Sequence, residues 1–437
     1  MFYSKKHILM KKIFLLLAAS MPLLGASAQD EIIVLPDGDD PVVNIIIGDK
    51  GQADDVQIEF VKNAPAKLND YGLPRFAIVG NDNKFYLGIG TQFLGEAMFD
   101  FGARNESLIG FIPSSFVPAT PGNGAAFNFS ALTSSIVVNA VALPGTKDRV
   151  GFFFKVVTHD GGNNYGFHLS HVYATYRGFL VGRTSSLFTD GAAMPFTIDD
   201  QGPNGSADYT TFTASYTGNI TDNFKAAIAI EQPDPDFTAG REVAYVTQRI
   251  PSIPLFLQYE WDGGKSHARM SGVFRTMQYR DLIEAKNRSQ LGWGVQLSGL
   301  ANPLQPLTLY WSATYGRGIG TYLQDDNGLH LDAIPSVIEE GRYKLVKNFG
   351  VTGGIKYEFS RHLAVNAMYS HLLNSCPDGA RIDGDAYRYG DYVAANVIYT
   401  INKIIATGIE YDYGHRKLFN GSSLHSSRIQ AQLAITF

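Results

Sequence analysis

The sequence predicts an all-β fold: a transmembrane antiparallel β-barrel, sixteen-stranded, with an N-terminal periplasmic extension. Apolar and polar residues alternate over long segments, and the chain ends in such a segment that finishes with Phe437. The composition agrees, since 45 of 437 residues are glycine, 12% are aromatic and only 18% are charged, against about 25% charged in ordinary domains. Mean hydropathy is -0.06, so the apolar residues are not gathered into helical membrane spans.

Charge and cysteine content exclude several classes of protein. A net charge of -5 and a pI near 6.1 argue against a nucleic-acid-binding protein, which carries a basic excess. The single cysteine, Cys376, excludes an intramolecular disulfide framework and a zinc site built from several cysteines. We expect no cofactor.

The N-terminus predicts export. Lys11 and Lys12 precede the apolar segment 13–19, and Ala26-Ser27-Ala28 follows it. A basic region, an apolar region and an A-x-A site are typical of a secretory signal peptide. We assign 1–28 to this signal, with cleavage near Ala28.

An acidic segment follows the signal. From Asp30 to Glu59 there are nine acidic residues and one basic residue, Lys50. This charge favours a solvated, extended segment. We therefore assign 29–72 to an acidic periplasmic extension, which could bind a periplasmic partner or fill the mouth of a pore, and 73–437 to the barrel.

Alternation with a period of two begins at Phe85. Odd positions from Phe85 to Phe93 are mostly apolar, whereas Gly88, Gly90 and Gln92 occupy even positions. Segments of about ten such residues are typical of an outer-membrane barrel, while a soluble secreted sandwich shows the same period in shorter strands. The expected strands are 85–101, 127–142, 149–158, 165–177, 178–187, 208–217, 224–232, 254–261, 267–279, 290–299, 307–316, 347–359, 362–373, 390–401, 404–415 and 425–437.

The number of strands is expected to be even, as in bacterial outer-membrane barrels whose two ends both lie in the periplasm. A further candidate strand, 242–249, would make the count odd, so we assign it to a loop and leave both barrel ends in the periplasm. Short connections such as 360–361 and 402–403 are expected as periplasmic turns. The expected external loops are 102–126, 188–207, 233–253, 317–346 and 374–389.

The C-terminal segment favours the barrel over a sandwich. Apolar residues occupy alternate places back from the terminal phenylalanine, as a closing strand with an aromatic at the membrane interface requires. This end also resembles the C-terminal address of bacterial outer-membrane proteins, so we expect contact with outer-membrane lipid and with the barrel assembly machinery. The closing-strand residues are Ile429, Leu433, Ile435 and Phe437.

Basic residues are expected on the lumen face. On strand 267–279, for example, His267, Arg269 and Arg275 share one face. Rings of Arg and Lys select anions, but these groups could instead pair with inward acids such as Glu410 and Asp412 and only stiffen the wall. The expected channel-lining basic residues are Arg149, Lys155, His168, Arg183, His267, Arg269, Arg275, Lys356 and Arg428.

The 188–207 loop mixes apolar residues with turn formers, which is unusual for a solvated loop. Folded into the barrel it would narrow the channel; the alternative is an ordinary external loop. Its carboxylates lack the D-x-D-x-D-G ligand order of a calcium loop, so we predict no metal. The expected constriction residues are Asp190, Met194, Phe196, Asp199 and Asp200.

Enzyme signatures are absent from the sequence. It contains no G-x-S-x-G, H-E-x-x-H or P-loop motif. Trp261, Trp293 and Trp311 fall at or inside expected strands; an aromatic girdle explains them, and sugar stacking is the alternative.

Several segments together resemble the DcaP-like trimeric porins of Gram-negative outer membranes. His171–Tyr176 and Leu180–Asp190 are similar to that family's H-A-Y and L-x-G-Q-T-x-S-x-F-x-D motifs, and 200–205 continues the likeness. Segments 249–251, 292–294 and 315–322 follow in the same order. The resemblance implies a sixteen-stranded homotrimeric channel for small anionic solutes, dicarboxylates among them.

The sequence thus predicts a passive outer-membrane channel for small hydrophilic solutes that favours anions, and no enzyme. The alternative is a barrel enzyme or a surface binding protein with a plugged lumen.

Overall fold

The computed structural model describes residues 53–66, 73–74, 76–80 and 83–437. The predicted signal peptide and the extension up to residue 52 lie outside the described residues. Among the helices in the described part of the chain, none is long and apolar enough to cross a membrane.

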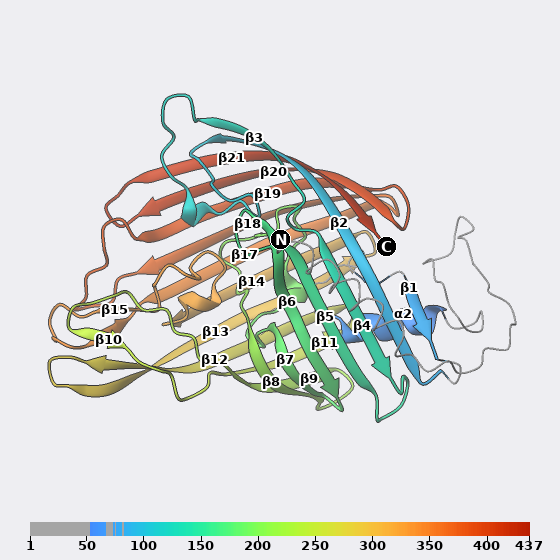
Figure 1. Ribbon diagram of the computed structural model, residues 1–437, viewed down its shortest axis with the longest axis horizontal. Helices are drawn as coiled ribbons and strands as arrows, with labels where there is room; N and C mark the ends of the chain where they lie inside the picture. Colours follow the sequence, from blue (N-terminus) through green and yellow to red (C-terminus); the bar gives the residue numbers. More distant parts are fainter. Residues whose placement is uncertain (1–52, 67–72, 75, 81–82) are drawn as a thin grey trace, which may run out of the picture.

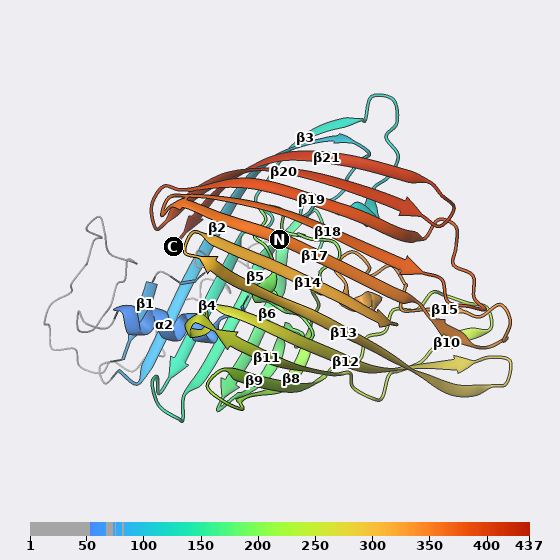
Figure 2. The same ribbon diagram turned by 180° about the vertical axis from the view of Figure 1, so that it is seen from behind.

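The chain forms a closed barrel of sixteen antiparallel strands, as the alternation predicts (Figures 1 and 2). Each strand pairs with the next along the wall, and β3 and β4 share one place beside β2. The wall strands are β2 (Phe85–Gly102), β3 (Ala125–Ser130), β4 (Ser135–Ala142), β5 (Val150–His159), β6 (Tyr165–Tyr176), β7 (Phe179–Ser185), β8 (Thr210–Asn219), β9 (Phe224–Glu231), β11 (Ile253–Trp261), β12 (Ser266–Asp281), β13 (Lys286–Leu304), β14 (Leu307–Arg317), β17 (Lys347–Ser360), β18 (Leu363–Ser375), β19 (Tyr387–Thr400), β20 (Ile405–Leu418) and β21 (Ser423–Thr436).

Two predicted segments differ in detail from the structure. The strand expected at 127–142 is divided, because the chain leaves the ladder at 131–134 and both parts then pair with β2. The candidate 242–249 contains only β10 (Val243–Tyr245), which pairs with the far end of β12. It adds no strand to the wall, in agreement with its assignment to a loop.

The last strand closes the barrel. Ile429 lies opposite Phe99 and Ile435 opposite Phe93 in the β21–β2 ladder. The backbone N–H of Phe437 then donates to the carbonyl of Thr91 at 2.9 Å. Ile429, Leu433 and Phe437 are exposed on the outer surface and Ile435 is half-buried, so the alternating C-terminus supplies both the closing ladder and an apolar outer face.

Along each strand, side chains point alternately to the outer surface and to the lumen. On β20, Ile409 and Tyr411 are exposed on the outer surface, whereas Glu410 and Asp412 point inward and are fully buried. Because the barrel is hollow, these carboxylates can be buried only if other groups cover them. The groups that do so belong to connections between strands that fold into the barrel, which we call inward-folded connections.

The two ends of the barrel differ. The C-terminus, helix α2 (Ala53–Asn63) and strand β1 (Phe76–Val79) lie at one end, and β10 lies at the other with the long connections (Figures 1 and 2). We take the end with the C-terminus as the periplasmic one. The long connections contain β15 (Ala333–Pro335), β16 (Tyr343–Leu345), η2 (Pro113–Ser115), η3 (Gly191–Ala193) and η5 (Gly320–Tyr322), whereas η4 (Asp262–Gly264) forms the short turn between β11 and β12.

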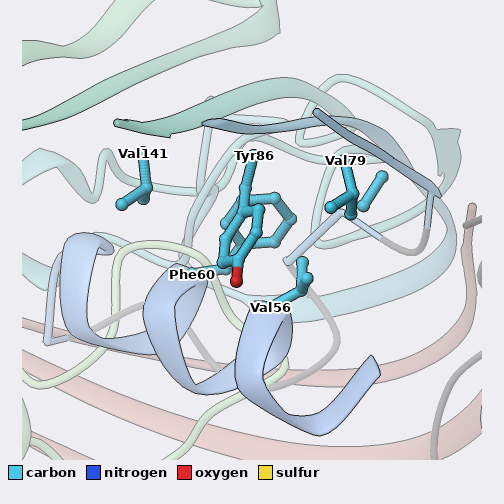
Figure 3. Close-up of a cluster of buried hydrophobic side chains, with 6 residues drawn as sticks. Val56, Phe60, Val79, Tyr86 and Val141 are labelled. Atoms are coloured by element: carbon cyan, nitrogen blue, oxygen red, sulfur yellow. The ribbon is translucent and has the colours of Figure 1, made fainter. Parts of the chain in front are cut away.

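Helix α2 corrects one expectation. The charge of the N-terminal extension favours an extended, solvated segment, yet residues 53–63 form a helix. Val56 and Phe60, four residues apart on one helix face, are buried against Tyr86 and Val141 of the wall (Figure 3). This apolar contact stabilises a helix that its charge content alone would not predict.

Candidate functional site

The inner loop, residues 186–209 between β7 and β8, runs inside the barrel. Polar contacts fix it to the wall at three places. At the first, Asp190 lies 2.9 Å from Nε2 of His267 on β12 and accepts a hydrogen bond from Ser298 on β13 at 2.7 Å. Burial by itself would raise the pKa of Asp190, but Arg269 and His267 lower it to about 2. The ionised carboxylate thus fixes the start of the loop to the wall.

The second place lies on β19 and β20. The backbone N–H groups of Ile198 and Asp199 donate to the carboxylate of Glu410 at 2.9 and 2.7 Å. The carboxylate of Asp199 in turn accepts from the hydroxyl of Tyr392 at 3.0 Å. Burial raises the pKa of Asp199 to about 7, although the positive charge of Arg428 opposes the shift.

The third place lies on β17 to β19. Asn204 donates to the carbonyl of Gly390 at 3.0 Å, and the N–H of Gly205 donates to the hydroxyl of Ser370 at 2.9 Å. Ser206 and Thr352 share a hydrogen bond of 2.9 Å. The loop therefore lies against the long strands of the C-terminal half.

A cavity of about 670 Å³ remains between this loop and the opposite wall. Lys155 of β5, His168 of β6 and Arg183 of β7 line it on the wall side. On the loop side the lining includes Met194, Phe196, Asp199 and Asp200. A basic wall thus faces an acidic and apolar loop.

Three of the nine basic residues expected in the lumen therefore line this cavity, and their role in solute passage stays a prediction. Two others, His267 and Arg269, instead contact the inner loop: Arg269 donates to the carbonyl of Thr189 at 3.3 Å. Asp190 is likewise held against the wall, whereas the other four expected constriction residues line the cavity.

Four expected channel-lining residues lie elsewhere. Arg275 is buried and paired with Asp332 at 3.0 Å, and Arg428 is buried and paired with Asp100 at 2.7 Å. Arg149 pairs with Glu59 of α2. Lys356 pairs with Glu358, two residues along the same strand. None of these four residues lines the cavity, and their contribution to a channel stays a prediction.

Further cavity residues were not expected from the sequence. His159 and His171 line the wall beside the basic residues, and the rings of His159 and His168 stack at 5.6 Å. His159 has the inward parity of Lys155 on β5, so alternation could have found it. His171 lies three residues from His168, and both face the cavity because a register shift lies between them on β6, which alternation could not show. Asp208, which precedes β8, carried no such signal.

Comparisons with known proteins bear on the fold. No protein-family model matches the sequence, and no curated protein matches it significantly. The crystal structure of the outer membrane channel DcaP of Acinetobacter baumannii matches with a TM-score of 0.70 and 20% identity, over 81% of this chain and 97% of that one. The chain shares the fold of the DcaP channel.

Two other solved structures are more distant. The anion-selective porin from Comamonas acidovorans has a TM-score of 0.52 and 11% identity, over 81% of this chain and 100% of that one. A loop-deletion mutant of OmpT, an outer membrane protein of Vibrio cholerae, has a TM-score of 0.50 and 9% identity over 81% and 100%. The DcaP-like fold expected from the sequence motifs is therefore confirmed.

Proposed function

We propose that this protein is an outer-membrane porin through which small hydrophilic solutes diffuse passively, with a preference for anions such as dicarboxylates. The cavity between the inner loop and the basic wall carries the proposal, since it places Lys155, His168 and Arg183 along one side of a barrel lumen. Cationic side chains lower the energy of an anion in a narrow pore. We propose no catalytic step.

The inner loop supports the anion preference in two ways. The charge of Asp190 is balanced by Arg269 at the wall, and the same carboxylate is hydrogen-bonded to His267. Asp199, whose pKa burial raises to about 7, is only partly ionised at neutral pH. The acidic side of the cavity therefore opposes the basic wall less than its composition suggests.

Planar-bilayer recording of the purified barrel tests the proposal. We expect discrete conductance steps, and reversal potentials in a salt gradient that indicate anion preference. Cation selectivity would contradict the anion preference alone, and absence of any conductance would contradict the channel.

A second candidate function is a surface binding protein with a plugged lumen. The observation in its favour is α2, which covers part of the lumen wall at the periplasmic end. The same recording separates the two, because a plugged barrel shows no steady conductance.

The proposed porin acts as a homotrimer in contact with outer-membrane lipid, after insertion by the barrel assembly machinery. The exposed aromatic residues of the outer face, such as Phe127, Phe129 and Phe167, fit lipid or subunit contact. We expect an oligomer band that resists SDS and is lost on heating; a monomer in mild detergent would contradict the trimer.

A further inference from the structure

Helix α2 lies on the inward face of the barrel at its periplasmic end. Its contacts are with Tyr86 of β2, Asn139 and Val141 of β4, and Tyr173 of β6. These positions have the inward parity of their strands, since Gln92 on β2 and Lys155 on β5, opposite Val137, line the cavity. Pro65 and Ala66, directly after the helix, line the same cavity. The helix thus occupies lumen space between the cavity and the periplasm.

An apolar contact seats the helix. The side chain of Phe60 is fully buried and packs with Tyr86 and Val141 (Figure 3). Gly88 of β2 makes room for it, because a Cβ at this position would lie 2.5 Å from the Phe60 ring. The wall is therefore shaped to receive this side chain.

A polar contact fixes the end of the helix. The Asn63 side-chain amide donates to Oδ1 of Asn139 at 2.8 Å and to the carbonyl of Phe152 at 3.0 Å. The hydroxyl of Tyr173 donates to the backbone carbonyl of Asn63 at 2.7 Å. A Cβ at Gly151 would lie 1.8 Å from Oδ1 of Asn63, so here too the wall leaves space for the docked helix.

An ion pair joins the helix to Arg149, which directly precedes β5. Glu59 pairs with Arg149, which also donates to the carbonyl of Glu59 at 3.0 Å. Lys62 lies 2.9 Å from the same carboxylate. Burial raises the pKa of Glu59, but the hydrogen bonds from Arg149 and Lys62 outweigh it and lower the pKa. The docked helix therefore neutralises a basic residue at the periplasmic end.

We propose that α2 is a resident plug that sets both the conductance and the ion selectivity of the channel. When the helix is docked, it narrows the periplasmic half of the lumen, and its Glu59 pairs with Arg149. When the helix is released, the lumen is wider and Arg149 can attract anions. The inference rests on the proposed channel function and deepens it, by naming a selectivity element outside the cavity.

Charge reversal tests the plug. E59R places like charges together and releases the helix, R149E does the same from the wall, and E59R/R149E restores an ion pair. We expect E59R to raise single-channel conductance about 1.5-fold or more, because a helix with its side chains is about 10–12 Å across. E59R should also shift the reversal potential toward anions. The double variant should return both quantities toward wild type.

The matched control is I58A. Ile58 is 50% exposed on the opposite face of the helix, so conductance should not change. Equal conductance in wild type, E59R and R149E would overturn the plug while leaving the channel intact. No conductance in any variant, wild type included, would instead overturn the channel function.

A disulfide gives a second, self-controlled measurement. In an E59R/N63C/N139C protein that also carries C376S, oxidation locks the helix to β4, whereas reduction lets the like charges at positions 59 and 149 release it. We expect reduction to raise the conductance of the same channels and to leave C376S alone unchanged. A conductance that does not respond to reduction, in a protein shown to be cross-linked, would overturn the plug. Heat-modifiable migration in SDS gels verifies that each variant has folded as a barrel.

Discussion

Two parts of the barrel wall differ in strand length and in the groups that cover their inward faces. We call the part from β12 to β21 the long wall and the part from β4 to β9 the short wall. Strands of the first have 11 to 19 residues, those of the second only 7 to 12. Inward polar groups of the long wall, such as Glu410 and Arg275, are buried and bonded to inward-folded connections. The short wall carries α2 at its periplasmic end and otherwise faces the cavity with Lys155, His168 and Arg183.

This difference shows that the position of a charge in a barrel does not by itself make it part of a channel. A buried charge needs a bonded partner, and on the long wall a connection or a neighbouring strand supplies it. We expect only the charges that the connections leave facing the cavity to act on a solute.

The largest effect is expected on the long wall. D100A leaves Arg428, which is 1% exposed in its side chain, without its carboxylate, and breaking a buried pair costs about 3–5 kcal/mol. The free energy of unfolding, from urea titration of the barrel in detergent, measures the loss. E106A removes the exposed partner of Arg104 and should cost less than about 1 kcal/mol. Equal losses would show that Arg428 is not held as described.

Release of the inner loop is expected to have the next largest effect. E410A removes the acceptor of two backbone N–H groups, and each unsatisfied buried donor costs about 1–3 kcal/mol. The loop should detach and conductance should rise, as it should on deletion of 192–198. The control is E358A, which removes one acid from the end of β17, away from the loop. A conductance unchanged by E410A would mean that the loop does not limit the channel.

A smaller effect is expected on selectivity. In water, one unit charge about 5 Å from an ion contributes about 0.8 kcal/mol, or roughly a fourfold change in the permeability of that ion. K155Q disfavours anions and favours cations, so it should lower the anion-to-cation permeability ratio by up to roughly sixteenfold, measured from reversal potentials. K356Q removes a lysine that is not among the residues lining the cavity and should change the ratio less. If K356Q has the larger effect, the cavity wall is not the selective region.

The smallest effect concerns pH and the external connections. Asp325 accepts a hydrogen bond from the N–H of Ser114 at 3.0 Å, and burial raises its pKa from 3.8 to about 7. The unfolded segment releases this proton near pH 4 and the folded one only near pH 7, so the stability of the contact falls as pH rises between these values. Proteolysis of the 102–126 connection should be slower at pH 5 than at pH 8. D325N should abolish this difference; a difference that persists would assign it to another group.

Alternation along the sequence predicted the wall in detail. Residues such as Ile409, Glu410, Tyr411 and Asp412 reveal their facing from two-residue spacing alone, and parity excluded 242–249 as a wall strand. The C-terminal alternation likewise predicted the closing strand. The missed division of the expected strand 127–142 has a local cause: residues 131–134 contain neither glycine nor proline to mark a break, yet the backbone leaves the ladder there.

The candidate site was predicted less completely. The sequence indicated that Arg275 and Arg428 face inward, but Asp332 lies 57 residues from Arg275, and Asp100 lies 328 residues from Arg428. Which acid meets which base depends on barrel closure and on the path of each connection. Helix α2 carried a weak signal, the four-residue spacing of Val56 and Phe60, which the surrounding acidic residues obscured.

The alternation of apolar and polar residues is sufficient to specify a hollow sixteen-stranded barrel with an apolar outer face. Successive side chains of a strand point to opposite faces, so the local sequence decides which residues face outward. The tertiary structure alone decided which inward charges face the cavity. That choice depends on contacts between segments far apart in the chain: the inner loop with β12 to β20, and α2 with β2, β4 and β6. Burial at those contacts, rather than residue type, separates Lys155 from Arg275.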